Sequence, residues 1–280
     1  MGLNFRNLLI KIFTVFIKYK CYNKLNTYLG VENMAKILII NGSRRKKNTY
    51  NLLKRIEKEF LNDEVEVLNV SDYNVKPCTG CEQCLRKGMC HIQDDATKIL
   101  DKMVEADGII IGTPIYLRQI PGNLKNIFDR GCAWYHRSPI VGTPIFFVTT
   151  TQVTGTKSAM DYLKDLSVQW GIIYTGKINR TLFNIEKPID KKVFRKFKNY
   201  LNKDNLKKYK PKYKQIIEFN TQKVLAEEIL PIDQEYWEER GYIDNPYFFK
   251  CKINPMKRIV GFLYYKFLKN LISKNKTTNN

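Results

Sequence analysis

Short apolar runs alternate with stretches of helical periodicity from Lys36 onward. Five runs, rich in β-branched and aromatic residues, have the length of strands buried on both faces: 36–41, 65–70, 108–113, 144–150 and 172–178. Between them, apolar residues recur at helical spacing over 50–61, 96–106, 122–130 and 155–170. This alternation predicts an α/β fold in which a five-stranded parallel sheet carries helices on both faces.

The regular alternation covers only the middle of the chain. Residues 1–33 contain an apolar stretch interrupted by Lys11, shorter than the roughly 20 apolar residues that a membrane-spanning helix needs. We interpret 1–33 as a basic amphipathic N-terminal extension, or as an over-long gene start before Met34. The expected organisation is therefore 1–33, an α/β domain over 34–180, and a basic, mainly helical C-terminal extension over 181–280.

Charge is distributed unevenly between these segments. The net charge is +21, and residues 191–280 carry 21 Lys and Arg against nine Asp and Glu. The excess thus belongs to the extensions and says little about the central chemistry. No zinc-finger histidine pair and no aromatic RNA-binding motif accompanies it, so no nucleic-acid partner is expected. Without an export signal, a reducing, cytoplasmic location is expected, and a disulfide framework is not.

Two segments of the C-terminal extension are rich in apolar side chains. The aromatic segment 236–249 is expected to pack onto the domain or onto a partner subunit. Residues 255–276 predict a basic helix with one apolar face, formed by Ile259, Leu263, Phe267 and Leu271. Such a face usually packs against its own protein. The alternative is peripheral contact with an anionic membrane through Met256–Ile272, so the protein would be cytoplasmic or membrane-associated.

The loops that follow the first, third and fourth predicted strands carry the candidate binding residues. Ligands of open α/β sheets bind beyond the carboxyl ends of the strands. The first of these loops ends at a predicted helix and offers hydroxyl, amide and guanidinium groups to a phosphate, from Ser43, Arg44, Asn48 and Thr49. It matches neither a Walker loop nor G-x-G-x-x-G. A capped helix with a basic surface loop is the simpler alternative.

The other two loops offer groups suited to a planar ligand. Pro114, Ile115 and Tyr116 leave the third strand, and Gly122 permits close backbone approach before the next helix. Thr150 and Thr151 supply hydroxyls after the fourth strand. Taken alone, each loop is compatible with an ordinary turn, but three such loops at one sheet edge favour a binding site.

Three stretches in order, "ILIINGSRRKKNTYNLL", "TPIYLRQIPGNLKNIFDR" and "TTTQ", resemble the flavodoxin-like NAD(P)H-dependent FMN reductases. The resemblance covers roughly 34–180 and implies a flavodoxin-like fold and oxidoreductase activity. It further implies that the first loop binds the FMN phosphate, while Pro114, Ile115, Tyr116 and Gly122 line the flavin. The chain departs from the family at 45–47, where Arg-Lys-Lys replaces Gly or small residues. No side chain is expected to act as nucleophile or general base.

Four cysteines, Cys78, Cys81, Cys84 and Cys90, form the pattern C-x2-C-x2-C-x5-C. Zinc sites with four thiolates usually use two separated C-x2-C turns, whereas cysteines stepping by three residues suit an iron–sulfur cluster. Redox-active or inert thiols remain a further alternative. The pattern resembles that of the iron–sulfur flavoproteins, which implies FMN and a [4Fe–4S] cluster in each subunit. Cys21, Cys132 and Cys251 are expected to be isolated structural residues, and His91 an exposed or packed histidine.

The resemblance implies electron transfer between a one-electron donor such as ferredoxin and a two-electron acceptor, in a homodimer or homotetramer. The nearest alternative is a cluster-free FMN or quinone reductase that takes hydride directly from NAD(P)H. A third hypothesis, from a different class, is a membrane-surface adaptor without enzymatic activity on the same scaffold.

Overall fold

The protein is described by a computed structural model covering residues 34–278, with side chains described through residue 275. The predicted N-terminal extension and Cys21 lie outside these residues. All elements described here belong to the unit Lys36–Asn280. Among the described residues no helix is long and apolar enough to cross a membrane.

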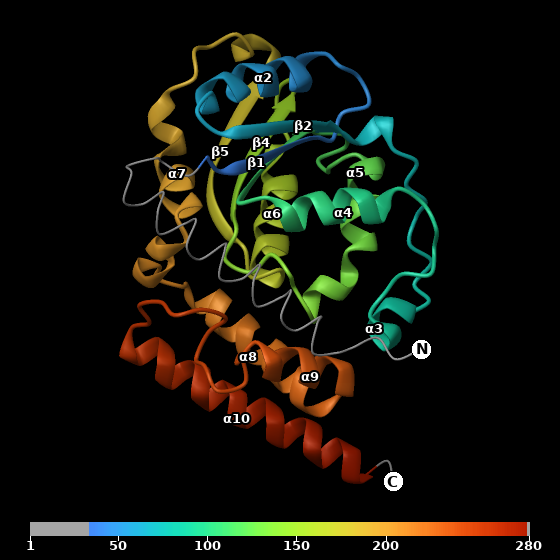
Figure 1. Cartoon of the computed structure of the whole chain (residues 1–280), viewed down its shortest axis with the longest axis vertical. Coiled ribbons are helices and arrows are strands. Elements are labelled where there is room, and N and C mark those ends of the chain that lie inside the picture. Colours follow the sequence, from blue (N-terminus) through green and yellow to red (C-terminus); the bar gives the residue numbers. More distant parts are fainter. Residues whose placement is uncertain (1–33, 279–280) are drawn as a thin grey trace, which may run out of the picture. The chain divides into compact units, whose positions relative to one another are not determined.

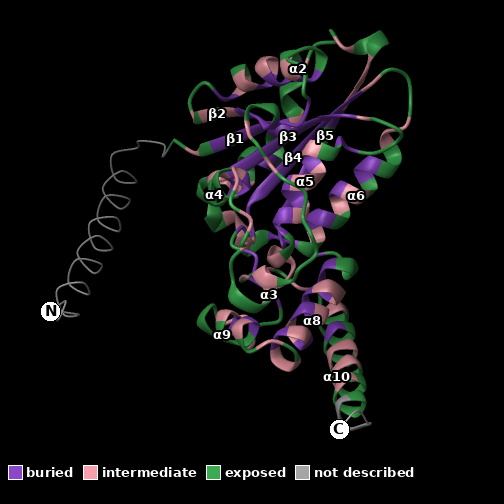
Figure 2. Cartoon of the chain, turned by 90° about the vertical axis from the view of Figure 1, so that its right-hand side faces the viewer, coloured by how far each residue is buried: buried purple, intermediate pink, exposed green. Residues whose placement is uncertain are grey.

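A single parallel sheet forms the centre of the fold (Figure 1). Its strands, in the spatial order β2-β1-β3-β4-β5, are Glu64–Asn69, Lys36–Asn41, Gly108–Pro114, Pro144–Thr151 and Ile173–Thr181. This is the flavodoxin-like order, which confirms the predicted fold class. Figure 2 shows these strands as mostly buried, and all seven residues of β3 are buried. Burial on both faces explains why β1, β3 and β4 read as continuous apolar runs, whereas the edge strands β2 and β5 are partly exposed.

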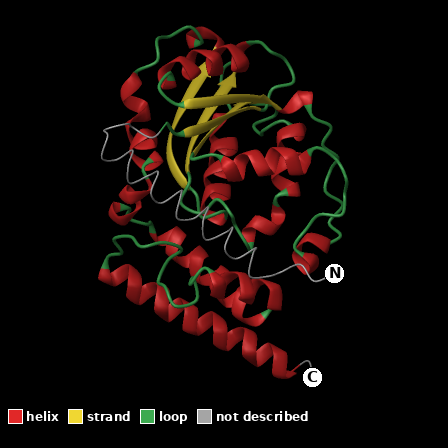
Figure 3. Ribbon diagram, viewed as in Figure 1, coloured by secondary structure: helices red, strands yellow, loops and turns green. Residues whose placement is uncertain are grey.

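Helices cover both faces of the sheet, as Figure 3 shows. On one face pack α4 (Ala96–Glu105), α5 (Gly122–Arg130) and α6 (Thr156–Gln169), whose apolar residues share a core with β1, β3 and β4. On the other face lie α2 (Asn48–Glu57) and α7 (Arg195–Leu201). Phe194 and Phe197, which the basic stretch 191–213 contributes, are fully buried against Phe60.

The segment beyond α7 builds a third apolar cluster. It contains α8 (Tyr213–Glu228), α9 (Pro231–Glu239) and α10 (Pro255–Thr278). Phe219 of α8, Trp237 of α9 and Phe248 of the predicted aromatic segment pack together, with Ile173 of β5 in the same cluster. The aromatic segment therefore packs within its own chain. The boundaries predicted at residues 33 and 180 stay predictions.

One glycine fixes the loop after β1 against the sheet. The backbone N–H of Gly42 donates to the carbonyl of Gly112 at the end of β3, 2.7 Å away. A Cβ atom at Gly42 would lie 2.8 Å from the Leu124 Cδ2 atom and 3.1 Å from that carbonyl. No side chain fits there, so this position holds the first binding loop close to α5.

Candidate functional site

The carboxyl ends of β1, β3 and β4 bring the predicted binding loops together. The hydroxyl groups of Thr49 and Thr150 are 2.7 Å apart and join the first loop to the last. Gly155, after β4, lies beside Ile115 and Arg118 of the middle loop. The sheet therefore collects on one edge the three loops that the sequence places far apart.

Within the first loop, the structure divides the predicted residues into buried and exposed ones. Ser43 and Thr49 are buried, whereas Arg44 and Asn48 are exposed. The backbone N–H of Ser43 donates to the side chain of Asn41, and its Oγ accepts from the backbone N–H of Arg45. The loop is thus held from within, which leaves the exposed guanidinium and amide groups available at its surface.

Helices α2, α5 and α6 begin at this edge without a capping side chain. None of the three has a side-chain hydrogen bond at its N-cap or an acidic residue in its first turn. The simpler alternative for the first loop, a capped helix, is therefore not observed. Three uncapped N-termini direct unpaired N–H groups and positive helix-dipole ends toward one edge, an arrangement that favours a bound anion.

The loop after β3 projects from the molecule. Pro114 is buried, Ile115 half-buried and Tyr116 exposed. Tyr116 and Gln119 exchange two backbone hydrogen bonds of 2.9 Å, and the two residues between them, Leu117 and Arg118, have φ angles of 47° and 66°. A positive φ is costly for a branched residue, so this exposed turn stores local strain, as ligand-binding loops often do.

Space and unpaired polar atoms remain next to the start of α5. A Cβ atom added to Gly122 would meet nothing within 4 Å. The side-chain nitrogen of the adjacent Asn123 is buried and has no hydrogen-bond partner. An orphaned buried donor beside an open helix N-terminus is a feature that a bound ligand would explain. The residues of this edge therefore fit an FMN group in donor chemistry.

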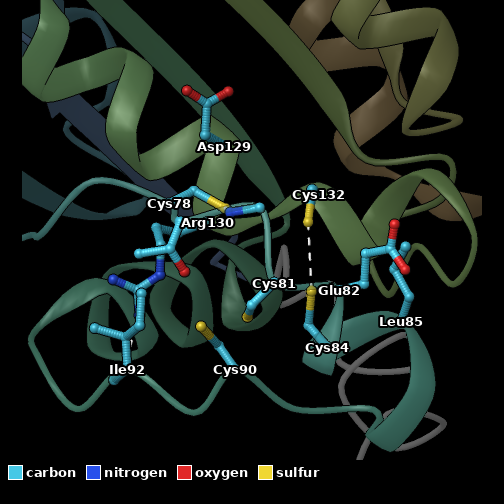
Figure 4. Close-up of a pocket in the computed structure, with 12 residues that line it drawn as sticks. Cys78, Cys81, Glu82, Cys84, Leu85, Cys90, Ile92, Asp129, Arg130 and Cys132 are labelled. Atoms are coloured by element: carbon cyan, nitrogen blue, oxygen red, sulfur yellow. Dashed lines mark hydrogen bonds between the residues drawn. The ribbon is translucent and has the colours of Figure 1, made fainter.

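A second site lies at the other end of α5 and is formed by cysteines (Figure 4). Cys78, Cys81, Cys84 and Cys90 all line one cavity of about 80 Å³. The cavity is walled by α3 (Gln83–Lys87), by the flanking loop and by the end of α5. The structure thus brings all four predicted cysteines together.

The cavity also contains a fifth thiol, which the sequence analysis misses. Cys132 follows α5, and its sulfur lies 3.4 Å from the sulfur of Cys84. The expectation that Cys132 is isolated is wrong, because α5 delivers it to the loop from 42 residues beyond Cys90 in sequence. The signal that could have found it is the direct continuation of the "IFDR" helix into Gly-Cys. Cys251 lies elsewhere and is half-buried.

Two arginines fasten the cysteine loop. Arg130 donates to the carbonyls of Lys76 and Ile92, on either side of the four cysteines, and forms an ion pair with Asp94 in which both side chains are 1% exposed. Arg137 donates to the carbonyl of Cys84 at 2.7 Å and pairs with Asp233 of α9. The loop is thereby tied to α5 and to the C-terminal extension.

The local environment shifts the pKa values of two thiols, Cys81 and Cys132, in opposite directions. The backbone N–H of Gln83 lowers the pKa of Cys81, whose sulfur also contacts the Nδ1 atom of His91 at 3.3 Å. Partial desolvation of its sulfur, with a contribution from Cys84, raises the pKa of Cys132, although the residue as a whole is exposed. His91 itself is exposed, as expected.

The cysteine cavity can be tested against the cluster that its pattern implies. Among residues 34–278, no group of three or more His, Cys, Asp or Glu side chains is arranged to hold a metal ion. The donor set, however, consists of thiols from five cysteines around one cavity, and thiolates are the ligands of iron–sulfur clusters. In donor chemistry the residues therefore fit a cluster.

Comparison with known proteins identifies the family. The protein family described as NADPH-dependent FMN reductase matches residues 35–181, which are just over half of the chain. The chain belongs to the NADPH-dependent FMN reductase family. The match covers the domain that contains the sheet, and the open edge of the sheet is where this fold presents its binding loops.

Several relatives of this reductase are called iron–sulfur flavoproteins. One from Archaeoglobus fulgidus is 48% identical over 97 residues, which are 34% of this chain and 48% of that protein. One from Methanocaldococcus jannaschii is 39% identical over 98 residues, 34% of this chain and 51% of that protein. One from Clostridioides difficile is 28% identical over 225 residues, 74% of this chain and 99% of that protein. The chain spans about half the length of the first two relatives.

Proposed function

We propose that this reductase is an electron-transfer flavoprotein that holds FMN at the carboxyl edge of the sheet and a [4Fe–4S] cluster in the cysteine cavity. Cys78, Cys81, Cys84 and Cys90 would bind the cluster, and electrons would pass between a one-electron donor such as ferredoxin and a two-electron acceptor. The observation that carries the proposal is the convergence of all four cysteines on one cavity. The names of the relatives point the same way.

Bound FMN would exchange one or two electrons and a bound cluster one at a time, so together they match donors and acceptors of different electron number. The chain's own residues would then bind and orient. Ser43, Arg44, Asn48 and Thr49 would hold the phosphate with the N-terminus of α2. Thr150 and Thr151, with Pro114, Ile115, Tyr116 and Gly122, would surround the flavin. NAD(P)H is a candidate electron donor at the same edge.

Helix α5 supports a connection between the two sites. It begins at Gly122 on the flavin edge and ends at Arg130 in the wall of the cysteine cavity. Nine residues at 1.5 Å per residue place its ends about 13 Å apart. The helix therefore sets a fixed separation between the two proposed cofactors within one subunit.

Exposed apolar side chains on the flavin edge support the expected homodimer or homotetramer. Tyr116, Leu117, Val153, Leu182 and Phe183, at the ends of three neighbouring strands, are exposed, Leu117 completely. Such a set on one edge favours cover by a second subunit. Light scattering on the Leu117→Glu/Phe183→Glu variant should then show a smaller assembly than the unaltered protein.

A cluster-free FMN or quinone reductase is the second candidate. It is favoured by the absence, among the described residues, of a group arranged to hold a metal ion. In that case hydride would pass from NAD(P)H to the flavin, and the cysteines would be redox-active or inert.

The deciding experiment is a UV–visible spectrum of anaerobically purified protein before and after dithionite, with iron and sulfide analysis. A broad shoulder near roughly 400 nm under the flavin bands, bleached on reduction, is expected for the cluster. Flavin bands alone, even after reconstitution with iron and sulfide, would establish the second candidate. Fast bleaching of the flavin bands by NAD(P)H would then support direct hydride transfer. A protein that binds no flavin would contradict both.

A further inference from the structure

The cysteine cavity has one thiol more than the proposed cluster needs. A [4Fe–4S] cluster takes four cysteine ligands, one for each iron. Five cysteines line the cavity: Cys78, Cys81, Cys84 and Cys90 from the loop, and Cys132 from the segment after α5 (Figure 4). One of the five is therefore not needed as a ligand, and the structure indicates which two cysteines lie in the same part of the cavity.

Cys84 and Cys132 occupy the same part of the cavity. Their sulfur atoms are 3.4 Å apart, which is direct contact between two sulfurs. Two thiolates in contact cannot serve irons at different corners of a cubane, because each corner points away from the others. Either sulfur, but not both, can therefore serve the corner that faces this wall.

Both cysteines are fixed from the backbone. Cys84 lies in α3, and its carbonyl accepts a hydrogen bond of 2.7 Å from Arg137. Cys132 begins the short helical turn Cys132–Tyr135, directly after the end of α5 and Gly131. Arg137 follows that same turn, so one arginine ties the segment carrying Cys132 to the helix carrying Cys84. The backbone segments that carry the two sulfurs are thus held together by this hydrogen bond.

We propose that Cys84 and Cys132 are alternative ligands for one iron of the cluster, so that the cavity carries a reserve thiolate at that corner. This inference rests on the proposed function. Cys78, Cys81 and Cys90 have no such neighbour among the sulfur contacts found in residues 34–278, so each would be the sole ligand of its iron.

Serine variants test the proposal on the full chain, purified anaerobically and reconstituted with iron and sulfide. The set comprises Cys84→Ser, Cys132→Ser, the double variant, and Cys81→Ser. Cys251→Ser is the matched control, because it removes a half-buried thiol outside the cavity. The readouts are iron and sulfide per protein and the electron paramagnetic resonance spectrum after reduction. FMN content reports whether each variant has folded.

The two single variants at the shared corner should keep at least about half of the iron of the unaltered protein, and Cys84→Ser should show a changed spectrum. The double variant and Cys81→Ser should lose nearly all iron while retaining FMN, and Cys251→Ser should match the unaltered protein. Complete iron loss in Cys84→Ser alone, or in Cys132→Ser alone, would overturn the inference. If the unaltered protein itself binds no iron, the proposed function fails first and the inference fails with it.

A separate observation concerns α10, whose two faces differ. One face packs on α8, where a Cβ atom at Gly261 would lie 2.6 Å from the Ile216 Cγ2 atom and the Tyr264 hydroxyl lies 3.1 Å from that of Thr221. The opposite face carries exposed apolar side chains at three- and four-residue spacing: Met256, Ile259, Val260, Leu263, Phe267 and Leu271. The packing stripe expected from the sequence is therefore the exposed face.

The basic residues around the exposed apolar face of α10 favour an anionic binding partner. Residues 255–278 contain six Lys and Arg and no Asp or Glu, and one of the six, Lys269, pairs with Glu227 and Glu228 of α8. Lys257 lies on one border of the apolar face and donates to the Pro211 carbonyl, and Lys266 lies on the other border and contacts the Phe262 ring. A second copy of this chain would bring the same basic helix against it, and the chain's net charge is +21. An anionic lipid surface supplies both the apolar interior and the opposite charge.

We propose that the exposed face of α10, residues 256–271, binds anionic membrane surfaces. This second proposal is independent of either cofactor. Co-sedimentation of the full chain with vesicles of phosphatidylcholine containing about 30% phosphatidylserine tests it, with phosphatidylcholine alone as the comparison. Binding is expected only to the anionic vesicles and should weaken with salt. Leu263→Glu/Phe267→Glu should bind at least about tenfold less.

The control variant is Leu61→Glu, which places one glutamate on another exposed leucine, 81% exposed and remote in sequence from α10. It should bind like the unaltered protein. Equal binding to both vesicle types, or no binding, would refute the proposal. So would a drop in oligomer size in the double variant without an effect on vesicle binding, because the face would then join two copies of the chain.

Discussion

Arg137 and Asp233 form a buried ion pair that connects the cysteine loop to the C-terminal extension. Their side chains are 8% and 1% exposed, and Asp233 also accepts from the Nδ1 atom of His136 at 2.9 Å. Since Arg137 also donates to the carbonyls of Cys84 and Leu85, this pair connects α9 to α3. The extension is therefore part of the construction of the cysteine site.

Asp233→Ala should lower the free energy of unfolding by about 3 kcal/mol or more, because it leaves the Arg137 charge buried without its partner. Chemical denaturation measures the change, and hydrogen exchange of the amides of 83–87 should become faster. Asp161→Ala, which removes an exposed ion pair with Lys164, is the control and should cost at most about 1 kcal/mol. Equal losses in the two variants would show that the buried pair has no special role.

Stability should fall on the acid side through Asp94. Burial alone would raise the pKa of Asp94, but hydrogen bonds from Arg130 and from the backbone N–H groups of Ala96 and Lys76 hold it below its usual range. A carboxyl with a lowered pKa in the folded state stabilises above its unfolded pKa of about 3.9 and loses that contribution as the pH falls through the folded value. Denaturation between about pH 5 and pH 1 should show this loss, and Asp94→Asn should flatten it. An unchanged pH profile in the variant would exclude Asp94 as the cause.

Thr150→Val should weaken FMN binding by about tenfold, because it removes the hydroxyl that joins the first and last loops of the predicted flavin edge. Fluorescence quenching of added FMN measures the affinity. Thr175→Val is a suitable control, since it removes a buried hydroxyl that donates to the Ile145 carbonyl near the start of the sheet. It should cost comparable stability and leave FMN affinity unchanged. If the two variants bound FMN equally well, Thr150 would have no part in the site.

Gly42→Ala and Gly122→Ala should have opposite effects on stability. A methyl group at Gly42 would press on Leu124 and the Gly112 carbonyl, so a loss of about 1–3 kcal/mol is expected. At Gly122, in the first turn of α5, the added methyl meets nothing, and alanine should be neutral or stabilise by up to about 1 kcal/mol. Thermal denaturation compares the two. Reduced FMN affinity in a stable Gly122→Ala variant would support close approach of the flavin there.

The fold could be predicted from the sequence because the three central strands, β1, β3 and β4, are buried almost throughout and the helices that cover the sheet have apolar sides. Local patterns also placed the four loop cysteines together, since they are close in sequence. Local sequence patterns could not predict contacts that depend on chain topology. Cys132 reaches Cys84 only because α5 runs back along the sheet. The pairing of Asp233 with Arg137 likewise joins segments 96 residues apart, and no periodicity in either segment signals it. The exposed face of α10 shows the same limit, because an apolar stripe does not reveal which side of a helix is covered.

Arg130 holds the two ends of the cysteine loop together. Its guanidinium, together with Asp94, closes the base of the loop from Lys76 to Ile92 with protein groups alone. Contacts within the protein therefore hold this loop, whatever occupies the cavity. Under the proposed function, a protein from which the cluster has been removed should keep its backbone structure and take up a new cluster without refolding.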